Sequence, residues 1–296
     1  MLIPMLSNGL EKTMNLAARK QWHCLVLASL LLGVGLRENL DAADAFSDPI
    51  DVSFTAECDG TTQKYVVLLP SGFSAEESYP LMVALHGHGS DRWQFATSTV
   101  NECRAARDVA LKHGMIFVAP DYRAKTSWMG PQAEADMIQI LKALKTKYKI
   151  DKTILVGASM GGSSSLSFAA MHPELIDGVA AMNGTANHLE YENFQDAIQV
   201  SFGGSKRDIP AEYKRRSAEY WPERLTMPVA ITTGGLDKSV PPDSCTRLAN
   251  VLKKLNAHVL HIHRPQGGHS TTSADAVKAL DFVCDHVLTE EKTTAK

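Results

Sequence analysis

The sequence predicts an α/β protein with a mostly parallel sheet that carries helices on both faces. Short apolar runs of strand length recur along the chain, and segments with helical periodicity lie between most of them. Strands that alternate with helices favour parallel pairing and need cover on both faces of the sheet. The expected strands span residues 65–69, 81–85, 115–119, 153–156, 179–182, 229–232 and 259–262.

The clearest expected helix spans residues 131–148. Pro131 suits a first helical turn, where the N–H that proline lacks would have no partner inside the helix. Met137, Leu141 and Leu144 share one face, and three lysines lie toward the C-terminal end, where the helix dipole favours cations. A helix with one apolar face is the element that covers a buried sheet.

Residues 1–45 predict a secretory signal peptide, which leaves residues 46–296 as a single domain. Arg19 and Lys20 precede an apolar run over residues 24–36, and a small-x-small cleavage pattern follows. The run is shorter than the roughly 20 residues that cross a bilayer, so no stable membrane insertion is expected. The protein is therefore expected to be secreted or periplasmic.

The composition is that of a globular protein without a nucleic-acid partner. The chain has 296 residues, 44% of them hydrophobic, and a formal net charge of -3, so it can bury one large core. It has no cluster of positive charge of the kind that neutralises phosphates. Residues 187–221 form the longest departure from the alternation of strands and helices, and a small cap over the carboxyl edge of the sheet is expected there.

Cleavage after residue 45 would leave four cysteines in the mature chain. An even number of cysteines in an exported protein suggests up to two disulfides. Four cysteines allow three pairings, and buried free thiols are the alternative. The four are Cys58, Cys103, Cys245 and Cys284.

The segment GASMG, residues 157–161, carries the strongest chemical signal. It matches G-x-S-x-G, the sharp turn that presents a serine hydroxyl between a strand and a helix. The segment follows the expected strand at 153–156 and precedes a helix expected over 160–171, which is the context that such a turn requires. Ser159 is therefore the predicted nucleophile, at a helix N-terminus that favours a developing anion.

A serine nucleophile needs a base, and the base needs a carboxylate to orient it. In a parallel sheet both are expected in loops at the carboxyl ends of later strands. Asp237 follows the strand at 229–232 and is the predicted acid, with Asp243 in reserve. His269 follows the last expected strand and is the predicted base, with His263 as the weaker competitor.

The order Ser159, Asp237, His269 is that of α/β-hydrolases. The motifs "LHGHG", "GASMGG", "GGLDKSVPP" and "GGH" occur in the corresponding sequence order, and residues from about 65 to 286 resemble an α/β-hydrolase of the esterase and prolyl-oligopeptidase-like group. The resemblance implies a serine hydrolase that acts on esters, or in some branches on peptides, and that needs no cofactor.

The resemblance also implies where an oxyanion would bind. The loop that begins at His86 follows a strand, as H-G-type loops do, so the backbone N–H groups of His88 and Met160 are the expected oxyanion donors. Trp128 lies in the loop after the strand at 115–119, on the same edge of the sheet. It is expected to line the substrate pocket, with packing in the core as the alternative.

Substrate class follows from chain length and from analogy. Oligopeptidases of the group carry a large additional domain, for which about 250 mature residues leave no room. Short-chain carboxylic esters are therefore expected, with acyl groups on carbohydrate suggested by analogy alone. A prolyl-oligopeptidase-like peptidase is the first alternative. A metal-dependent hydrolase that uses His86, His88 and Asp91 and a non-catalytic binding protein are the weaker ones.

Overall fold

A computed structural model describes residues 45–256 and 258–289. The chain divides into two units, 1–45 and 46–296, and almost all described residues belong to the second. The predicted signal peptide lies outside the described residues, apart from Ala45. Among the described helices, none combines the length and the apolar character needed to span a bilayer.

Eight strands form one sheet in the order β1-β2-β4-β3-β5-β6-β7-β8. The six strands from β4 to β8 in this order pair in parallel, whereas β1 and β2 run antiparallel at one edge. The predicted mostly parallel sheet is therefore confirmed. The strands are β1 (Ile50–Thr55), β2 (Thr62–Leu68), β3 (Ser78–Leu85), β4 (Ile116–Pro120), β5 (Lys149–Ala158), β6 (Gly178–Met182), β7 (Val229–Gly234) and β8 (Val259–Arg264).

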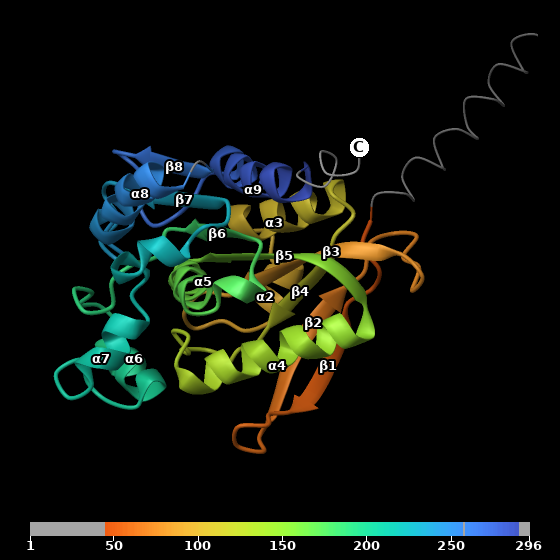
Figure 1. The fold of residues 1–296 in the computed structure, drawn as a ribbon, viewed down its shortest axis with the longest axis horizontal. Helices are drawn as coiled ribbons and strands as arrows, with labels where there is room; N and C mark the ends of the chain where they lie inside the picture. Colours follow the sequence, from red (N-terminus) through yellow and green to blue (C-terminus); the bar gives the residue numbers. More distant parts are fainter. Residues whose placement is uncertain (1–44, 257, 290–296) are drawn as a thin grey trace, which may run out of the picture. The chain divides into compact units, whose positions relative to one another are not determined.

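Helices cover both faces of this sheet (Figure 1). Helices α3 and α9 lie on one side, and α4 and α5 lie on the other. The α-helices are α2 (Trp93–Thr97), α3 (Asn101–Lys112), α4 (Pro131–Lys147), α5 (Met160–Met171), α6 (Gln195–Phe202), α7 (Pro210–Arg215), α8 (Asp243–Leu255) and α9 (Ser273–Thr289). Short 3-10 turns are η1 (Pro173–Leu175), η2 (Ala218–Tyr220) and η3 (Pro222–Arg224).

Two hydrophobic cores result, one on each face of the sheet. Successive side chains of a strand point to opposite faces. In β5, Ile154 and Val156 join the core beneath α3 and α9, whereas Leu155 joins the core that includes Met137 and Leu141 of α4. Burial on both faces explains why the central strands read as continuous apolar runs instead of alternating ones.

Strand β1 was not predicted from the sequence, because its residues carry no continuous apolar run. It is an edge strand, and its side chains alternate between exposed and half-buried positions along its second half. Its six backbone pairings with β2 hold it in the sheet, from Ile50 opposite Val67 to Thr55 opposite Thr62. Pairing that depends on the neighbouring strand leaves a weak signal in the strand's own sequence.

The four described cysteines form no disulfide. Cys58 is exposed, and the other three are buried in the cores. Burial raises the pKa of each of these three thiols to about 12, so they are protonated and act as small apolar side chains. Of the alternatives that the sequence left open, the structure contains the free thiols.

The segment at 187–221 contains α6, α7 and η2, and Arg216 ties it to α4. Arg216 is 1% exposed, and its guanidinium donates to Glu134 Oε2 at 2.8 Å and to Glu212 Oε1 at 2.7 Å. Arg215 and His172 also contact the Glu134 carboxylate. Burial raises the pKa of this carboxyl, but the surrounding cations outweigh burial and hold the pKa well below its ordinary value.

Replacing Glu134 with Gln is expected to lower the free energy of unfolding by about 3 kcal/mol near pH 7, because buried Arg216 loses one of its two carboxylate partners and keeps only Glu212. Since the folded-state pKa of Glu134 is depressed, its contribution is present above the unfolded pKa and is lost as the pH falls toward the folded value. Wild type should therefore lose more stability than Glu134→Gln between neutral and acidic pH. Urea denaturation across this range measures both effects.

Glu174 provides the control, because its exposed carboxylate also faces His172. Glu174→Gln should change the free energy of unfolding by no more than about 0.5 kcal/mol. An equal loss of stability in the two variants would contradict the role given to the buried pair.

Candidate active site

Ser159 occupies the turn between β5 and α5, where the backbone packs very closely. Its φ of 58° and ψ of -121° are strained for a residue with a side chain. A Cβ atom added at Gly161 would lie 2.0 Å from the carbonyl oxygen of Leu85, and one added at Gly157 would lie 2.3 Å from that of Gly161. Glycine at both positions therefore lets the turn form and present Ser159 at the end of the strand.

His269 connects Ser159 to Asp237 through a chain of hydrogen bonds. His269 Nε2 lies 2.9 Å from Ser159 Oγ, and His269 Nδ1 lies 2.7 Å from Asp237 Oδ2. Asp237 is buried, and its other oxygen accepts the backbone N–H groups of Ser239 and Val240, both at 2.9 Å. A carboxylate accepts a proton at Nδ1, which leaves Nε2 free to accept the serine proton.

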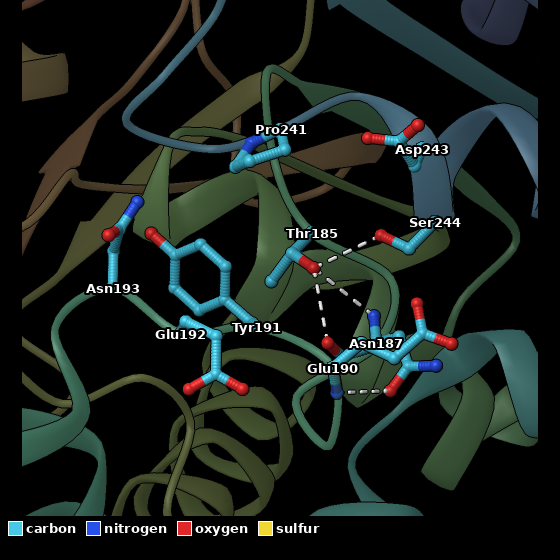
Figure 2. A pocket seen from close by; sticks show the side chains of 9 residues that line it. All are labelled: Thr185, Asn187, Glu190, Tyr191, Glu192, Asn193, Pro241, Asp243 and Ser244. Carbon is cyan, nitrogen blue, oxygen red and sulfur yellow. Dashed lines mark hydrogen bonds between the residues drawn. The ribbon is translucent and has the colours of Figure 1, made fainter.

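The structure places the reserve residues elsewhere. His263 Nδ1 lies 2.9 Å from Thr233 Oγ1, beside His261 on β8. Asp243 is the first residue of α8 and lines a cavity of about 270 Å³, shown in Figure 2. This cavity is called the second cavity below, because a different one contains Ser159 and His269. Neither Ser159 nor His269 lines that cavity. Its wall consists of Thr185, Asn187, Glu190, Tyr191, Glu192, Asn193, Pro241, Asp243 and Ser244.

Thr271 anchors the loop that carries His269. Its backbone N–H donates to Glu102 Oε1 at 2.6 Å. Its Oγ1 accepts from Asn183 Nδ2 at 3.0 Å and lies 2.8 Å from Thr232 Oγ1. These bonds tie the loop to α3, to the end of β6 and to β7, so the imidazole is supported from three elements.

The sequence did not reveal Glu102 or Asn183. Asn183 directly follows β6 and has a φ of 48°, and a polar residue at the carboxyl end of a parallel strand is a signal that was available. Glu102 lies in the first turn of α3, where an acidic residue is ordinary, so nothing in its pattern marks it.

A cavity of about 250 Å³ contains both Ser159 and His269. Gln94 lies in its wall and accepts the Gly87 N–H through Oε1 at 2.7 Å, which fixes the loop after β3. The remaining wall includes apolar, polar and ionisable side chains. The lining residues are Gly87, His88, Gln94, Phe95, Val100, Glu102, Cys103, Ala158, Ser159, Asn183, His269 and Ser270.

The two expected oxyanion donors come from the start of α5 and from the loop after β3. Met160 is the first residue of α5, so its N–H belongs to the first N–H groups of a helix, which have no acceptor within it. His88 lies in the loop after β3, and no acceptor among residues 45–256 and 258–289 is bonded to its backbone N–H. Both groups are therefore available to a bound oxygen.

Trp128 lies beneath this site and not in its wall. Its side chain is 0% exposed and packs among aromatic rings, including those of Tyr191 and Phe194. Its Nε1 donates to His88 Nδ1 at 3.2 Å. Indole N–H is only a donor, so His88 Nδ1 must accept and the proton of a neutral ring sits on Nε2. Of the two positions expected for Trp128, the structure shows the packed one, in which its indole also supports His88.

The side chains of the metal alternative are held by other partners. His86 lies with Nδ1 2.8 Å from the Gly87 carbonyl oxygen and Nε2 3.0 Å from that of Asp121. Asp91 Oδ1 accepts the Trp93 N–H. Across the described part of the chain, no three His, Cys, Asp or Glu side chains converge as a ligand set.

Several solved structures share this fold. An S-formylglutathione hydrolase from Agrobacterium tumefaciens aligns with a TM-score of 0.65 and 15% identity over 82% of this chain and 98% of that chain. A puromycin-hydrolyzing peptidase from Mycobacterium tuberculosis aligns with a TM-score of 0.64 and 19% identity over 81% of this chain and 39% of that chain. A putative dipeptidyl aminopeptidase IV from Bacteroides ovatus aligns with a TM-score of 0.64 and 16% identity over 82% of this chain and 36% of that chain.

At these identities the likeness shows the fold, and the α/β-hydrolase fold predicted from the sequence is confirmed. The chain spans only 36% to 40% of the length of the first peptidases it matches. No curated protein sequence matches the chain. Residues 106–288 match the model of the prolyl oligopeptidase family, and this match covers more than half of the chain. The protein therefore belongs to the prolyl oligopeptidase family of serine hydrolases.

Proposed function

We propose that the protein hydrolyses carboxylic esters through an acyl-enzyme on Ser159, with His269 as the base and Asp237 as the orienting acid. The hydrogen-bond chain from Ser159 Oγ through the imidazole to the Asp237 carboxylate is the observation that carries the proposal. The side chain of His269 is 33% exposed and that of Asp237 is 1% exposed. The base is therefore accessible to substrate, and the acid is shielded from solvent.

In the proposed reaction, His269 Nε2 takes the Ser159 proton as Oγ attacks the ester carbonyl. The N–H groups of His88 and Met160 stabilise the oxygen that gains charge. The imidazolium then gives its proton to the leaving alcohol, and the C–O bond of the ester breaks. Water, deprotonated by His269, attacks the acyl-enzyme and releases the acid, while Asp237 stabilises the imidazolium at each step.

Two observations support ester over peptide substrates. An alkoxide leaving group needs less protonation than an amine, so a site without dedicated peptide contacts serves esters first. The S-formylglutathione hydrolase aligns over 98% of its own length, whereas the peptidases align over a part of theirs. Peptide hydrolysis is the second candidate, and the family match is the observation that favours it.

The proposal extends to location and to a substrate group on the basis of sequence alone. The basic residues, apolar run and small-residue pattern in residues 1–45 support export to the periplasm or the medium. An exported esterase meets acyl groups on carbohydrate, and such esters belong in the first panel of substrates.

Ser159→Ala is expected to lower kcat/KM for a p-nitrophenyl ester by about 10⁴-fold or more, because no nucleophile remains. Labelling by a fluorophosphonate probe should disappear in the same variant, while the circular dichroism spectrum stays that of wild type. A folded wild-type protein that the probe does not label would favour a binding function.

Asp237→Asn should lower kcat by about 10⁴-fold, since an amide N–H facing Nδ1 imposes the wrong tautomer on His269. Asp243→Asn is the matched control and should leave kcat near that of wild type, because Asp243 lines the second cavity. Steady-state kinetics decides between them, and the opposite pattern would move the acid to Asp243.

A panel of short p-nitrophenyl esters should give higher kcat/KM than prolyl and alanyl peptide anilides. The reason is that the alcohol part of an ester leaves with less protonation than the amine of a peptide anilide. Acetylated sugars form a further arm of the same assay. A peptide substrate with a kcat/KM above that of every ester would make peptide hydrolysis the better assignment.

A further inference from the structure

Glu102 places a buried carboxylate in the wall of the cavity that contains Ser159. The residue is 5% exposed and lines this cavity together with His269. The only hydrogen-bond partner of its carboxylate among the described residues is the Thr271 N–H, which Oε1 accepts. Within the described part of the chain, no Lys, Arg or His side chain forms an ion pair with it. A buried carboxylate without a counter-charge is costly.

The local fold explains how this carboxylate persists without a cation. Glu102 lies in the first turn of α3, where the helix dipole favours negative charge. The 2.6 Å bond from the Thr271 N–H adds a charge-assisted contact. These interactions involve one carboxylate oxygen and the helix end, so Oε2 has capacity for a further partner.

The other ionisable groups in the cavity wall contribute no opposing charge at neutral pH. His88 Nδ1 accepts from Trp128, which favours its neutral ring, and burial lowers the pKa of that imidazole. Burial, followed by the charge of Glu102, raises the pKa of Cys103 to about 12, so its thiol is protonated.

The two basic residues of α3 that follow Glu102 most closely in the sequence are bonded to other groups. Arg104 Nε lies 3.5 Å from Asp108 Oδ2. The guanidinium of Arg107 donates to the carbonyl oxygens of Phe95 at 2.5 Å and Ser98 at 2.7 Å. In the proposed mechanism His269 is neutral before it takes the serine proton. Glu102 is therefore the one formal charge in the described wall of this cavity when the enzyme awaits substrate.

We propose that Glu102 binds a cationic group of the substrate, so that the preferred esters carry a protonated or quaternary amine close to the reacting carbonyl. A substrate that enters the cavity removes water from the carboxylate, and a positive group compensates for that loss where a neutral one does not. The proposal rests on the proposed function, because it assigns the substrate class of the same site. The cation belongs either to the acyl part or to the alcohol part of the ester.

Two pairs of esters with nearly equal shapes test the proposal and distinguish the two parts. Alanine methyl ester and methyl isobutyrate differ by an ammonium group in place of a methyl group on the acyl side. Acetylcholine and 3,3-dimethylbutyl acetate differ by a quaternary nitrogen in place of carbon on the alcohol side. In one pair, the full-length protein should give a kcat/KM about tenfold or more higher for the cationic ester.

Glu102→Gln tests the residue itself. The amide oxygen of Gln still accepts the Thr271 N–H, so the loop of His269 keeps its anchor while the charge is lost. The ratio of kcat/KM between the cationic and neutral members of the preferred pair should fall to about one, mainly through a higher KM for the cationic ester. Glu190→Gln, in the second cavity, is the matched control and should keep the wild-type ratio.

Each other outcome overturns the proposal. A wild-type ratio near one in both pairs, with both esters hydrolysed, rejects the cationic substrate while leaving the ester hydrolase intact. An unchanged ratio in Glu102→Gln rejects Glu102 as the binding residue. A higher kcat/KM for 6-O-acetylglucose than for either cationic ester rejects cationic esters as the preferred substrate class. Hydrolysis of none of these esters, with no probe labelling at Ser159, rejects the proposed function as well.

Discussion

Close backbone packing at the turn between β5 and α5 is the constraint on which the site depends. Gly161 lets the first turn of α5 pack closely on Leu85 of β3, and Gly157 of β5 leaves room for Gly161 itself. Ser159 takes a strained conformation between the two glycines. The strain is tolerated because the sheet is buried on both faces by two large cores, which leave the turn no room to relax. The cores therefore stabilise the geometry of a single hydroxyl group.

The remaining residues of the site lie on loops that hydrogen bonds hold in place. The loop of Asp237 is held by its own carboxylate, and the loop of His269 is held through Thr271 by groups from three elements. Below them, Trp128 sets the ring of His88. Polar contacts thus fix the positions of the loops at this edge of the sheet, whereas hydrophobic packing fixes the helices and strands elsewhere in the domain.

Sequence patterns predicted the elements and residues that have local signatures. Ser159 is marked by its flanking glycines, and Asp237 and His269 are marked by their places after strands, so the three could be named before their contacts were known. Glu102 could not be found, because an acidic residue in the first turn of a helix is common and its meaning depends on a cavity formed by distant segments. For Trp128 the sequence left both the pocket wall and the core open, since its burial is set by aromatic neighbours far along the chain.

The Asp237 carboxylate has a divided role that links assembly to chemistry. One oxygen closes the loop on the backbone at Ser239 and Val240, and the other orients His269. The positions of the loop and of the imidazole are therefore coupled, because each bond restrains the carboxylate for the other. Preorganisation is thus a property of the native fold in this part of the molecule, and no separate rearrangement of the acid is needed before a substrate reacts.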